Sequence, residues 1–353
     1  RFTAEQMYHM SNNMLQLFDK FQTQYKLLNT IINPGFHIQN AVSNAFQSFL
    51  GVGTDAVNPA KIKRAYHVLR TNDPKQTLKL HGKEYTYREL KFMAEQSGIL
   101  DNTFFNKDIA GNMNKFFLYN FGTKVGTEIE GIGRFNMFLS YLDQGKSMKE
   151  AVEGVNHFLF DYGELTSTEH KLFKRVIPFY TFMRKNFPME LEQMLEQPQT
   201  FSNLNKAFTE FEKAAGDDYV DENHRNEWRQ EYIQLPWKMK DSELNVLNQD
   251  LPYSYDIERT YGVADQLPYN QIERLVDPKK VLAQTTPLVK APLEALRGKY
   301  LYTDMDIDSP LDYLVNQVPA TKIPYLANTT KDAGTERNLY ILGQLLGFPI
   351  NTI

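Results

Sequence analysis

Residues 175–198 read RVIPFYTFMRKNFPMELEQMLEQP, and this stretch places two prolines ten residues apart in an otherwise helical pattern. Pro178 and Pro188 lack the amide hydrogen that a helix interior needs, and each ring clashes with the preceding turn, so an internal proline kinks or ends a helix. We therefore expect corners at both prolines. Between them, the aromatic residues of PFYTF should enter the core, while Arg184 and Lys185 face outward.

Helical patterns continue on the N-terminal side of this jointed segment. Apolar residues recur at three and four residue steps in 3–32, which is typical of an amphipathic helix. This helix should stop at Asn33, Pro34 and Gly35, so Pro34 and Gly35 are candidate structural joints. A second helix should follow and end near residues 51–53, and its polar face is rich in amide side chains.

Three further helix starts are marked by capping boxes. Thr86, Ser147 and Thr166 are each followed three residues later by Glu, which lets hydroxyl and carboxylate satisfy the free amides of a first turn. Residues 77–86 alternate apolar and polar side chains around a His-Gly pair, which predicts a small β-hairpin.

The texture of the chain changes near residue 230, because ten of the 16 prolines lie beyond that point. Long helices do not survive that density of proline. We predict a mainly α fold: residues 1–216 form a multi-helix body with proline-kinked helices and one small β-hairpin. Residues 217–232 form a polar link, and 233–353 form a proline-rich wrap of short helices and extended segments.

Composition excludes several classes of site. The 353 residues contain no cysteine, which removes disulfides, thiolate metal sites and cysteine nucleophiles. The formal charge of −4 gives no bulk field that would draw the chain onto nucleic acid or an anionic membrane. No apolar run approaches the ~20 residues of a membrane-spanning helix. The chain opens on Arg1, which we interpret as a boundary within a larger polypeptide.

Short motifs suggest chemistry only weakly. The seven histidines form no HExxH or HxH pair, so surface or structural roles are favoured over zinc. Residues 304–315, DMDIDSPLDYLV, begin like a calcium loop but carry Ser309 where the loop needs glycine and Val315 where it needs Glu, which favours a turn and helix cap. GVGTD at 51–55 is more simply a helix stop than half a phosphate loop. Asp161 and Glu164 form a carboxylate pair for which capping roles are favoured.

One local cationic patch remains, formed by Lys174, Arg175, Arg184 and Lys185 and flanked by aromatic residues. This patch could contact the phosphates of nucleic acid, or it could contact a partner protein. The alternative, which we favour, is that these charges extend to solvent from an aromatic core helix. No catalytic, cofactor-binding or metal-binding residue is predicted.

Three stretches together resemble a known family. They are IINPGFHIQNAVSNAFQSFLG (31–51), the block from RFNMFLSYLDQG to MLEQP (134–198), and TTPLVKAPLEAL (285–296) with the tail RNLYILGQLLGF (337–348). Their order is similar to that in very large, multi-module bacteriophage virion proteins that carry the large polyvalent protein-associated domains. The resemblance covers about residues 27–353.

The resemblance implies a bacteriophage virion protein of the internal kind that leaves the particle with the genome at infection. Because the residues show no recognisable catalytic set, we expect this module to be structural and non-enzymatic. Enzymatic modules would lie elsewhere in the full polypeptide. Expected partners are portal, tail or internal virion proteins and further copies of the chain, with local DNA contact as an option. The expected location is the head interior, portal or tail lumen, then the host envelope or cytoplasm after ejection. Two alternatives stay open: a membrane-active module of a DNA-translocation conduit, and a metal-dependent enzyme using Asp161 and Glu164.

Overall fold

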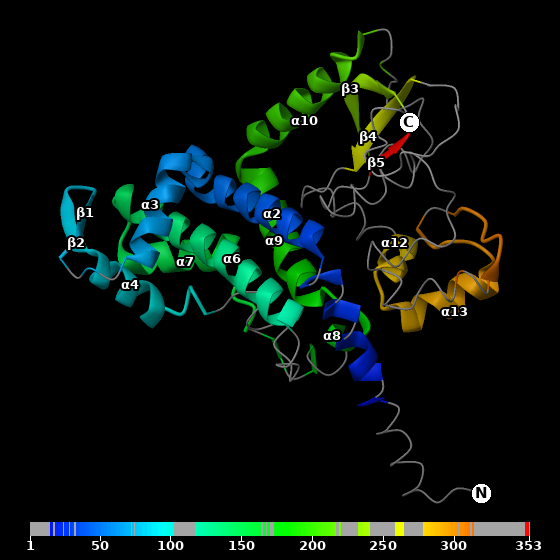
Figure 1. The fold of residues 1–353 in the computed structure, drawn as a ribbon, viewed down its shortest axis with the longest axis horizontal. Coiled ribbons are helices and arrows are strands. Elements are labelled where there is room, and N and C mark those ends of the chain that lie inside the picture. Colours follow the sequence, from blue (N-terminus) through cyan, green and yellow to red (C-terminus); the bar gives the residue numbers. More distant parts are fainter. Residues whose placement is uncertain are drawn as a thin grey trace, which may run out of the picture. The chain divides into compact units, whose positions relative to one another are not determined.

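The protein is mainly helical in the computed structural model, as the sequence predicts (Figure 1). The structure describes residues 15–16, 18–23, 25–27, 29–31, 33–71, 73, 75–101, 117–163, 165–166, 168–169, 173–216, 219, 232–240, 258–264, 278–302, 304–310, 313 and 350–352. The chain divides into two compact units. Unit 1 comprises residues 1–39, 175–178 and 194–353, and unit 2 comprises 40–174 and 179–193. Each unit is therefore built from segments that are far apart in sequence.

Unit 2 contains most of the long helices. Its elements are α2 (Pro34–Val52, which begins in unit 1), the 3-10 helix η1 (Gly53–Val57), α3 (Pro59–Arg70), β1 (Thr77–Leu80), β2 (Lys83–Thr86), α4 (Tyr87–Gln96), α6 (Phe117–Asp143), α7 (Met148–Phe158), and α9 (Tyr180–Glu196, which ends in unit 1). The short helix α8 (Lys174–Val176) precedes α9. Helix α6 packs against both α3 and α7, so it is the central element of this unit.

The predicted helix starts are confirmed. Thr86 and Ser147 form complete capping boxes at the first turns of α4 and α7. Thr166 makes the same reciprocal bonds with Glu169, since its backbone amide donates to the carboxylate and its hydroxyl accepts from the Glu169 amide. These pairings satisfy amides that would otherwise lack partners, which is why the sequence pattern predicts them.

The predicted hairpin is also confirmed. Strands β1 and β2 are antiparallel with Leu80 opposite Lys83, which leaves His81 and Gly82 as the two turn residues. Both turn residues have positive φ, 43° and 80°. This is the geometry that matches the right-handed twist of the flanking strands.

Two glycines allow the helices of unit 2 to pack closely around Tyr141 of α6. A Cβ atom on Gly154 of α7 would lie 2.5 Å from Cε2 of Tyr141, and one on Gly51 of α2 would lie 2.8 Å from its hydroxyl. Neither position has room for a larger residue. Burial raises the pKa of Tyr141 to about 12, so the phenol stays neutral in this contact.

Arg134 of α6 is the largest fully buried side chain among the described residues. Its Nε donates to Oε1 of Glu130 at 3.1 Å, one turn earlier on the same helix. Its Nη2 donates to the carbonyls of Leu159 and Phe160, the latter at 2.6 Å. Phe160 has a φ of 55°, an uncommon value for a non-glycine residue, so the turn directly after α7 is strained. The hydrogen bonds from Arg134 hold the chain in this turn.

Unit 1 combines helices with a second sheet that the sequence analysis did not predict. Its further elements are α10 (Pro198–Lys213), β3 (Tyr232–Lys240), β4 (Glu258–Ala264), α12 (Pro278–Ala283), α13 (Pro287–Arg297) and β5 (Ile350–Thr352). Strand β4 lies between β3 and β5, antiparallel to both. The register of β3 shifts between Gln234 and Lys238, around Pro236, which has no amide hydrogen for the ladder. Most of the predicted link 217–232 lies outside the described residues.

The two prolines of the opening stretch have different environments. Pro178 is buried in the non-helical residues 177–179 between α8 and α9, a corner as expected. Pro188 instead lies inside α9, which continues from Tyr180 to Glu196, so it does not separate two helices. Pro188 is exposed, and an unpaired carbonyl on an exposed face can be hydrated, which lowers the cost of a proline within a helix.

Candidate functional site

The four predicted cationic residues are divided between the two units. Arg175 belongs to unit 1, whereas Lys174, Arg184 and Lys185 belong to unit 2. Both nitrogens of the Arg175 fork donate to Asp19, at 2.6 and 2.7 Å. Arg184 forms an ion pair with Glu169. The two arginines are therefore already engaged by carboxylates, which favours the structural interpretation of these charges.

The carboxylate of Glu169 accepts hydrogen bonds from several donors, two of which lie in the first turns of α9. Its carboxylate accepts from the Thr166 amide at 2.8 Å, the Thr166 hydroxyl at 2.7 Å and the Tyr180 hydroxyl at 3.1 Å, besides Arg184. The bonds from Thr166, then those from Tyr180 and Arg184, lower the pKa of Glu169 to about 2. The carboxylate is thus ionised at neutral pH with its acceptor sites occupied, so it joins 166–169 to α9 and has no role as a general acid.

The other two predicted joints, Pro34 and Gly35, lie at the start of helix α2. Helix α2 starts at Pro34, the first helical position, where a missing amide hydrogen has no cost. The side chain of Asn33 accepts from the amide of Gly35 at 3.0 Å. The expected stop of the preceding helix and start of the next therefore coincide with this Asn-Pro-Gly sequence.

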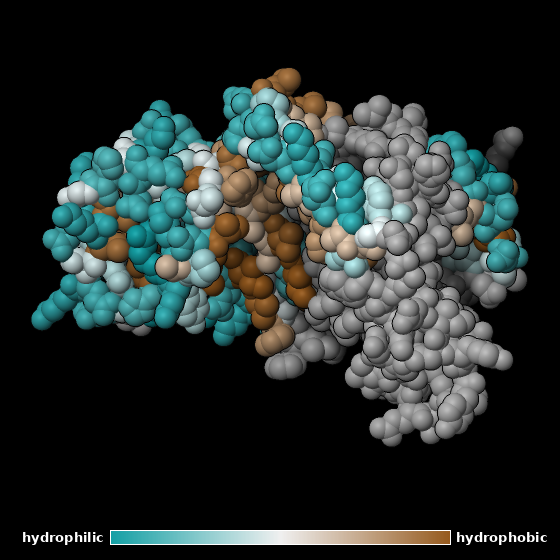
Figure 2. All heavy atoms as spheres, turned by 90° about the horizontal axis from the view of Figure 1, so that it is seen from above, coloured by the Kyte–Doolittle hydropathy of each residue, from teal (hydrophilic) through white to brown (hydrophobic). Residues whose placement is uncertain are grey.

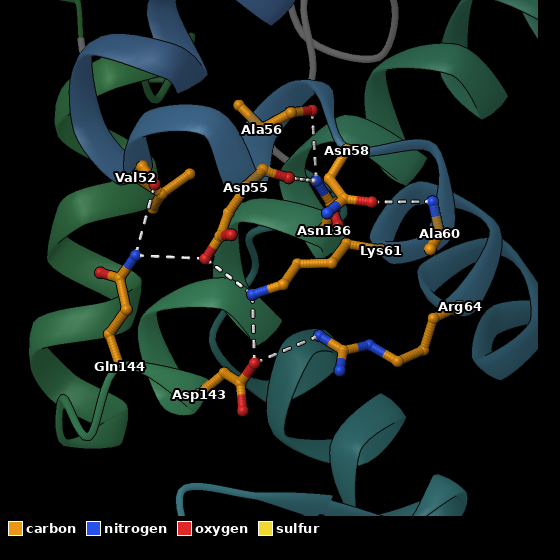
Figure 3. A network of polar contacts seen from close by, with 10 residues as sticks. All are labelled: Val52, Asp55, Ala56, Asn58, Ala60, Lys61, Arg64, Asn136, Asp143 and Gln144. Carbon is orange, nitrogen blue, oxygen red and sulfur yellow. Dashed lines mark hydrogen bonds and ion pairs between the residues drawn. The ribbon is translucent and has the colours of Figure 1, made fainter.

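A polar network connects η1, α3 and the C-terminal end of α6 (Figure 3). The ammonium of Lys61 lies 2.7 Å from Asp55 and 3.2 Å from Asp143, and Arg64 lies 3.8 Å from Asp143. Asn136 and Gln144 add hydrogen bonds to backbone carbonyls of 52–56. The two cations and two anions of the network balance in charge. They form ion pairs with one another.

The chemistry of this network is that of a structural joint. Partial burial alone would lower the pKa of Lys61, but the hydrogen bonds and charges of Asp55 and Asp143 raise it overall. A lysine with a raised pKa is a poor nucleophile or base at neutral pH. The GVGTD segment, considered as a phosphate loop, directs its Asp55 carboxylate at Lys61, an arrangement that opposes an anionic ligand.

Two of the three aspartates in 304–308 form ion pairs. Asp304 contacts Lys279 at 2.7 Å and Arg297 at 2.5 Å, and Asp306 contacts Lys299 at 3.2 Å. The backbone of Ser309 accepts from the Tyr313 amide, as a turn leading into a helix requires. Among the described residues, no group of three or more His, Cys, Asp or Glu side chains could hold a metal ion. The turn interpretation of this motif therefore agrees with the structure better than a calcium loop.

The structure describes only one member of the carboxylate pair considered for metal chemistry. Asp161 accepts from the amide of Gly163 at 2.8 Å, a local turn contact. Glu164 lies outside the described residues. Of the histidines, His157 lies 3.4 Å from Glu192 at the surface.

Helix α9 has a buried polar face that the sequence did not predict, formed by Asn186, Glu190 and Gln193. These residues are 3%, 0% and 2% exposed, although their residue types are typical of a surface. Gln47 of α2 donates to Oδ1 of Asn186 at 2.7 Å. Burial raises the pKa of Glu190 to about 8, against a smaller opposing influence from the Asn186 side chain. The i, i+4, i+7 spacing was the available signal, since it places all three on one side of the helix.

Comparisons with known proteins add no assignment. A scan against protein-family models and searches of curated proteins and of solved structures found no match to this chain. None of the helices in the part of the chain that the structure describes is long and apolar enough to cross a membrane.

Proposed function

We propose that this chain is a non-enzymatic structural module of a bacteriophage virion protein, internal to the particle and ejected with the genome, that acts by packing on other virion proteins. The observation that carries this proposal is that the motifs of the family resemblance are also the residues that shape the fold. Asn33 and Pro34 start α2, and Arg134 holds the turn after α7. The LTSTE and PFYTFMR segments meet where Tyr180 and Arg184 contact Glu169.

Motifs of an enzyme family usually converge on a pocket in which reactive groups remain available. Here the motif side chains are used in helix starts, corners and ion pairs. That distribution supports a module whose sequence is constrained by its shape and contacts and not by a reaction.

The surface of unit 1 offers apolar groups for such contacts. Helix α13 exposes Leu288, Leu293 and Leu296, with exposed fractions of 41%, 43% and 88%. Leu282 of α12 is also 42% exposed. Figure 2 shows hydrophobic residues interrupting the hydrophilic surface of the described part of the protein. Large exposed apolar side chains are candidates for packing against another molecule.

The test combines assembly and binding measurements. Leu296→Gln should leave the melting temperature unchanged, because Leu296 is 88% exposed, while reducing incorporation of the protein into phage particles. Lys213→Gln, a change at another exposed helical position, is the control and should assemble normally. Crosslinking in intact particles should join the chain to other virion proteins. A chain that sediments as a strict monomer and forms no protein crosslinks in particles would contradict the proposal.

The membrane-active alternative shares the exposed leucines of α13 and is separated by one further measurement. Flotation with neutral and anionic lipid vesicles should leave the protein unbound if its apolar face serves protein contacts. Vesicle binding that Leu296→Gln abolishes would favour the membrane role instead.

A further inference from the structure

Helix α9 has an unusual place in the connectivity of unit 2. Residues 179–193 belong to this unit, but the residues directly before them, 175–178, and those after them, from 194 onward, belong to unit 1. The rest of unit 2, residues 40–174, is continuous without α9. The helix is therefore held in unit 2 by side-chain contacts, since neither of its own chain connections leads directly to unit 2.

Both ends of α9 are non-helical joints next to proline. Residues 177–179, which include Pro178, separate α9 from α8. At the other end Gln197, with φ −127° and ψ 50°, separates α9 from α10, which begins at Pro198. Backbone changes at a few residues that end an element are enough to reorient it as a rigid body.

The contacts that α9 makes in unit 2 include buried polar groups, whereas a helix interface is normally apolar. Gln47 of α2 donates a hydrogen bond to Oδ1 of Asn186 on α9. Within the described residues, neither carboxyl oxygen of Glu190 has a hydrogen-bond partner, and the buried Nδ2 of Asn44 on α2 also lacks one. Buried polar atoms without partners weaken an interface, because they lose their hydration and gain no bond in return.

Aromatic and charged contacts surround this face without supplying a counter-charge to Glu190. Phe182 contacts Phe160 edge to face, with ring centroids 6.0 Å apart. Burial and the Asn186 amide are the influences on the Glu190 carboxyl, and no charged group contributes. Three charged pairs lie on α9 and on elements near it: Arg134 with Glu130, Arg184 with Glu169, and His157 with Glu192. Lys174 of α8 and Lys185 and Glu196 of α9 are further charged groups.

We propose that α9 is a hinged element that stays docked in unit 2 while Glu190 is protonated and separates from α2 when this carboxyl ionises. A buried carboxylate without a partner costs far more than a buried carboxylic acid. Separation hydrates the carboxylate, and the joints at 177–179 and 197 allow it without unfolding α3 or α6. This inference is independent of the phage assignment, because it rests only on contacts within the chain.

The test is hydrogen exchange followed by mass spectrometry between pH 6.5 and 9, with rates corrected for the intrinsic pH dependence of exchange. A group that changes from a pKa of 4.5 when exposed to about 8 when docked should raise the opening of α9 about 30-fold across this range. Peptides of 180–193 should lose protection accordingly. Peptides of α3, residues 59–70, should keep theirs.

Two neutral variants and one control make the result specific. Glu190→Gln and Glu190→Met should both make the protection of α9 independent of pH. Glu153→Gln removes a charge from an exposed position of α7 and should behave as the original protein. The proposal is overturned if α9 protection does not depend on pH, if both neutral variants retain the dependence, or if α3 loses protection together with α9.

Discussion

Replacing Arg134 by Met tests the interaction that supports the centre of unit 2. The change removes the donor to two backbone carbonyls after α7 and leaves Glu130, which is 2% exposed, without its cation. Breaking a buried ion pair by removing one partner typically costs about 3–5 kcal/mol. We expect a loss of stability in this range, since Arg134 is fully buried and water has no access to the vacated carbonyls.

Urea denaturation followed by circular dichroism at 222 nm measures the free energy of unfolding. Arg88→Met, at an exposed position of α4, is the matched control and should change it by less than about 0.5 kcal/mol. The double variant Glu130→Met with Arg134→Met should recover at least about 1 kcal/mol relative to Arg134→Met alone, because no buried charge remains. A loss below about 1 kcal/mol for Arg134→Met would refute the reasoning.

Three further changes test other parts of unit 2. Gly154→Ala should lower stability by about 1–3 kcal/mol in thermal denaturation, because its Cβ would lie 2.5 Å from the Tyr141 ring. A Cβ at Gly131 of α6 would meet nothing within 4 Å, so the control Gly131→Ala should stabilise the protein. The pKa of Glu169 is lowered from 4.5 to about 2, so the stability that this carboxylate contributes is present above pH 4.5 and is lost as the pH falls toward 2. Glu169→Gln should therefore flatten that part of the curve of stability against pH. Pro188→Ala should leave the helical content unchanged or slightly higher, because α9 is already continuous, and a large loss of helical signal would contradict this view of the helix.

Local rules account for the parts of the fold that the sequence predicted. The capping boxes of Thr86 and Ser147, the His81-Gly82 turn and the start of α2 at Pro34 depend on atoms within about four residues of one another. Such contacts form in the same way wherever the helix or hairpin is placed. The pairing state of Arg175 and Arg184 could not be predicted, since their carboxylate partners are 156 and 15 residues away in sequence.

The sequence by itself determined where α2, α4 and α7 begin and that the chain is mainly α, because capping and periodicity act within single elements. Only the tertiary structure decided which polar residues are buried. Nothing near Arg134 or Glu190 in the sequence distinguishes them from surface charges, yet both are fully buried, because helices that are distant in sequence pack over them. The same packing supplies Arg134 with its carbonyl partners and leaves Glu190 without a counter-charge. Burial is a property of the assembled helices, and it sets the charge state on which the hinge of α9 depends.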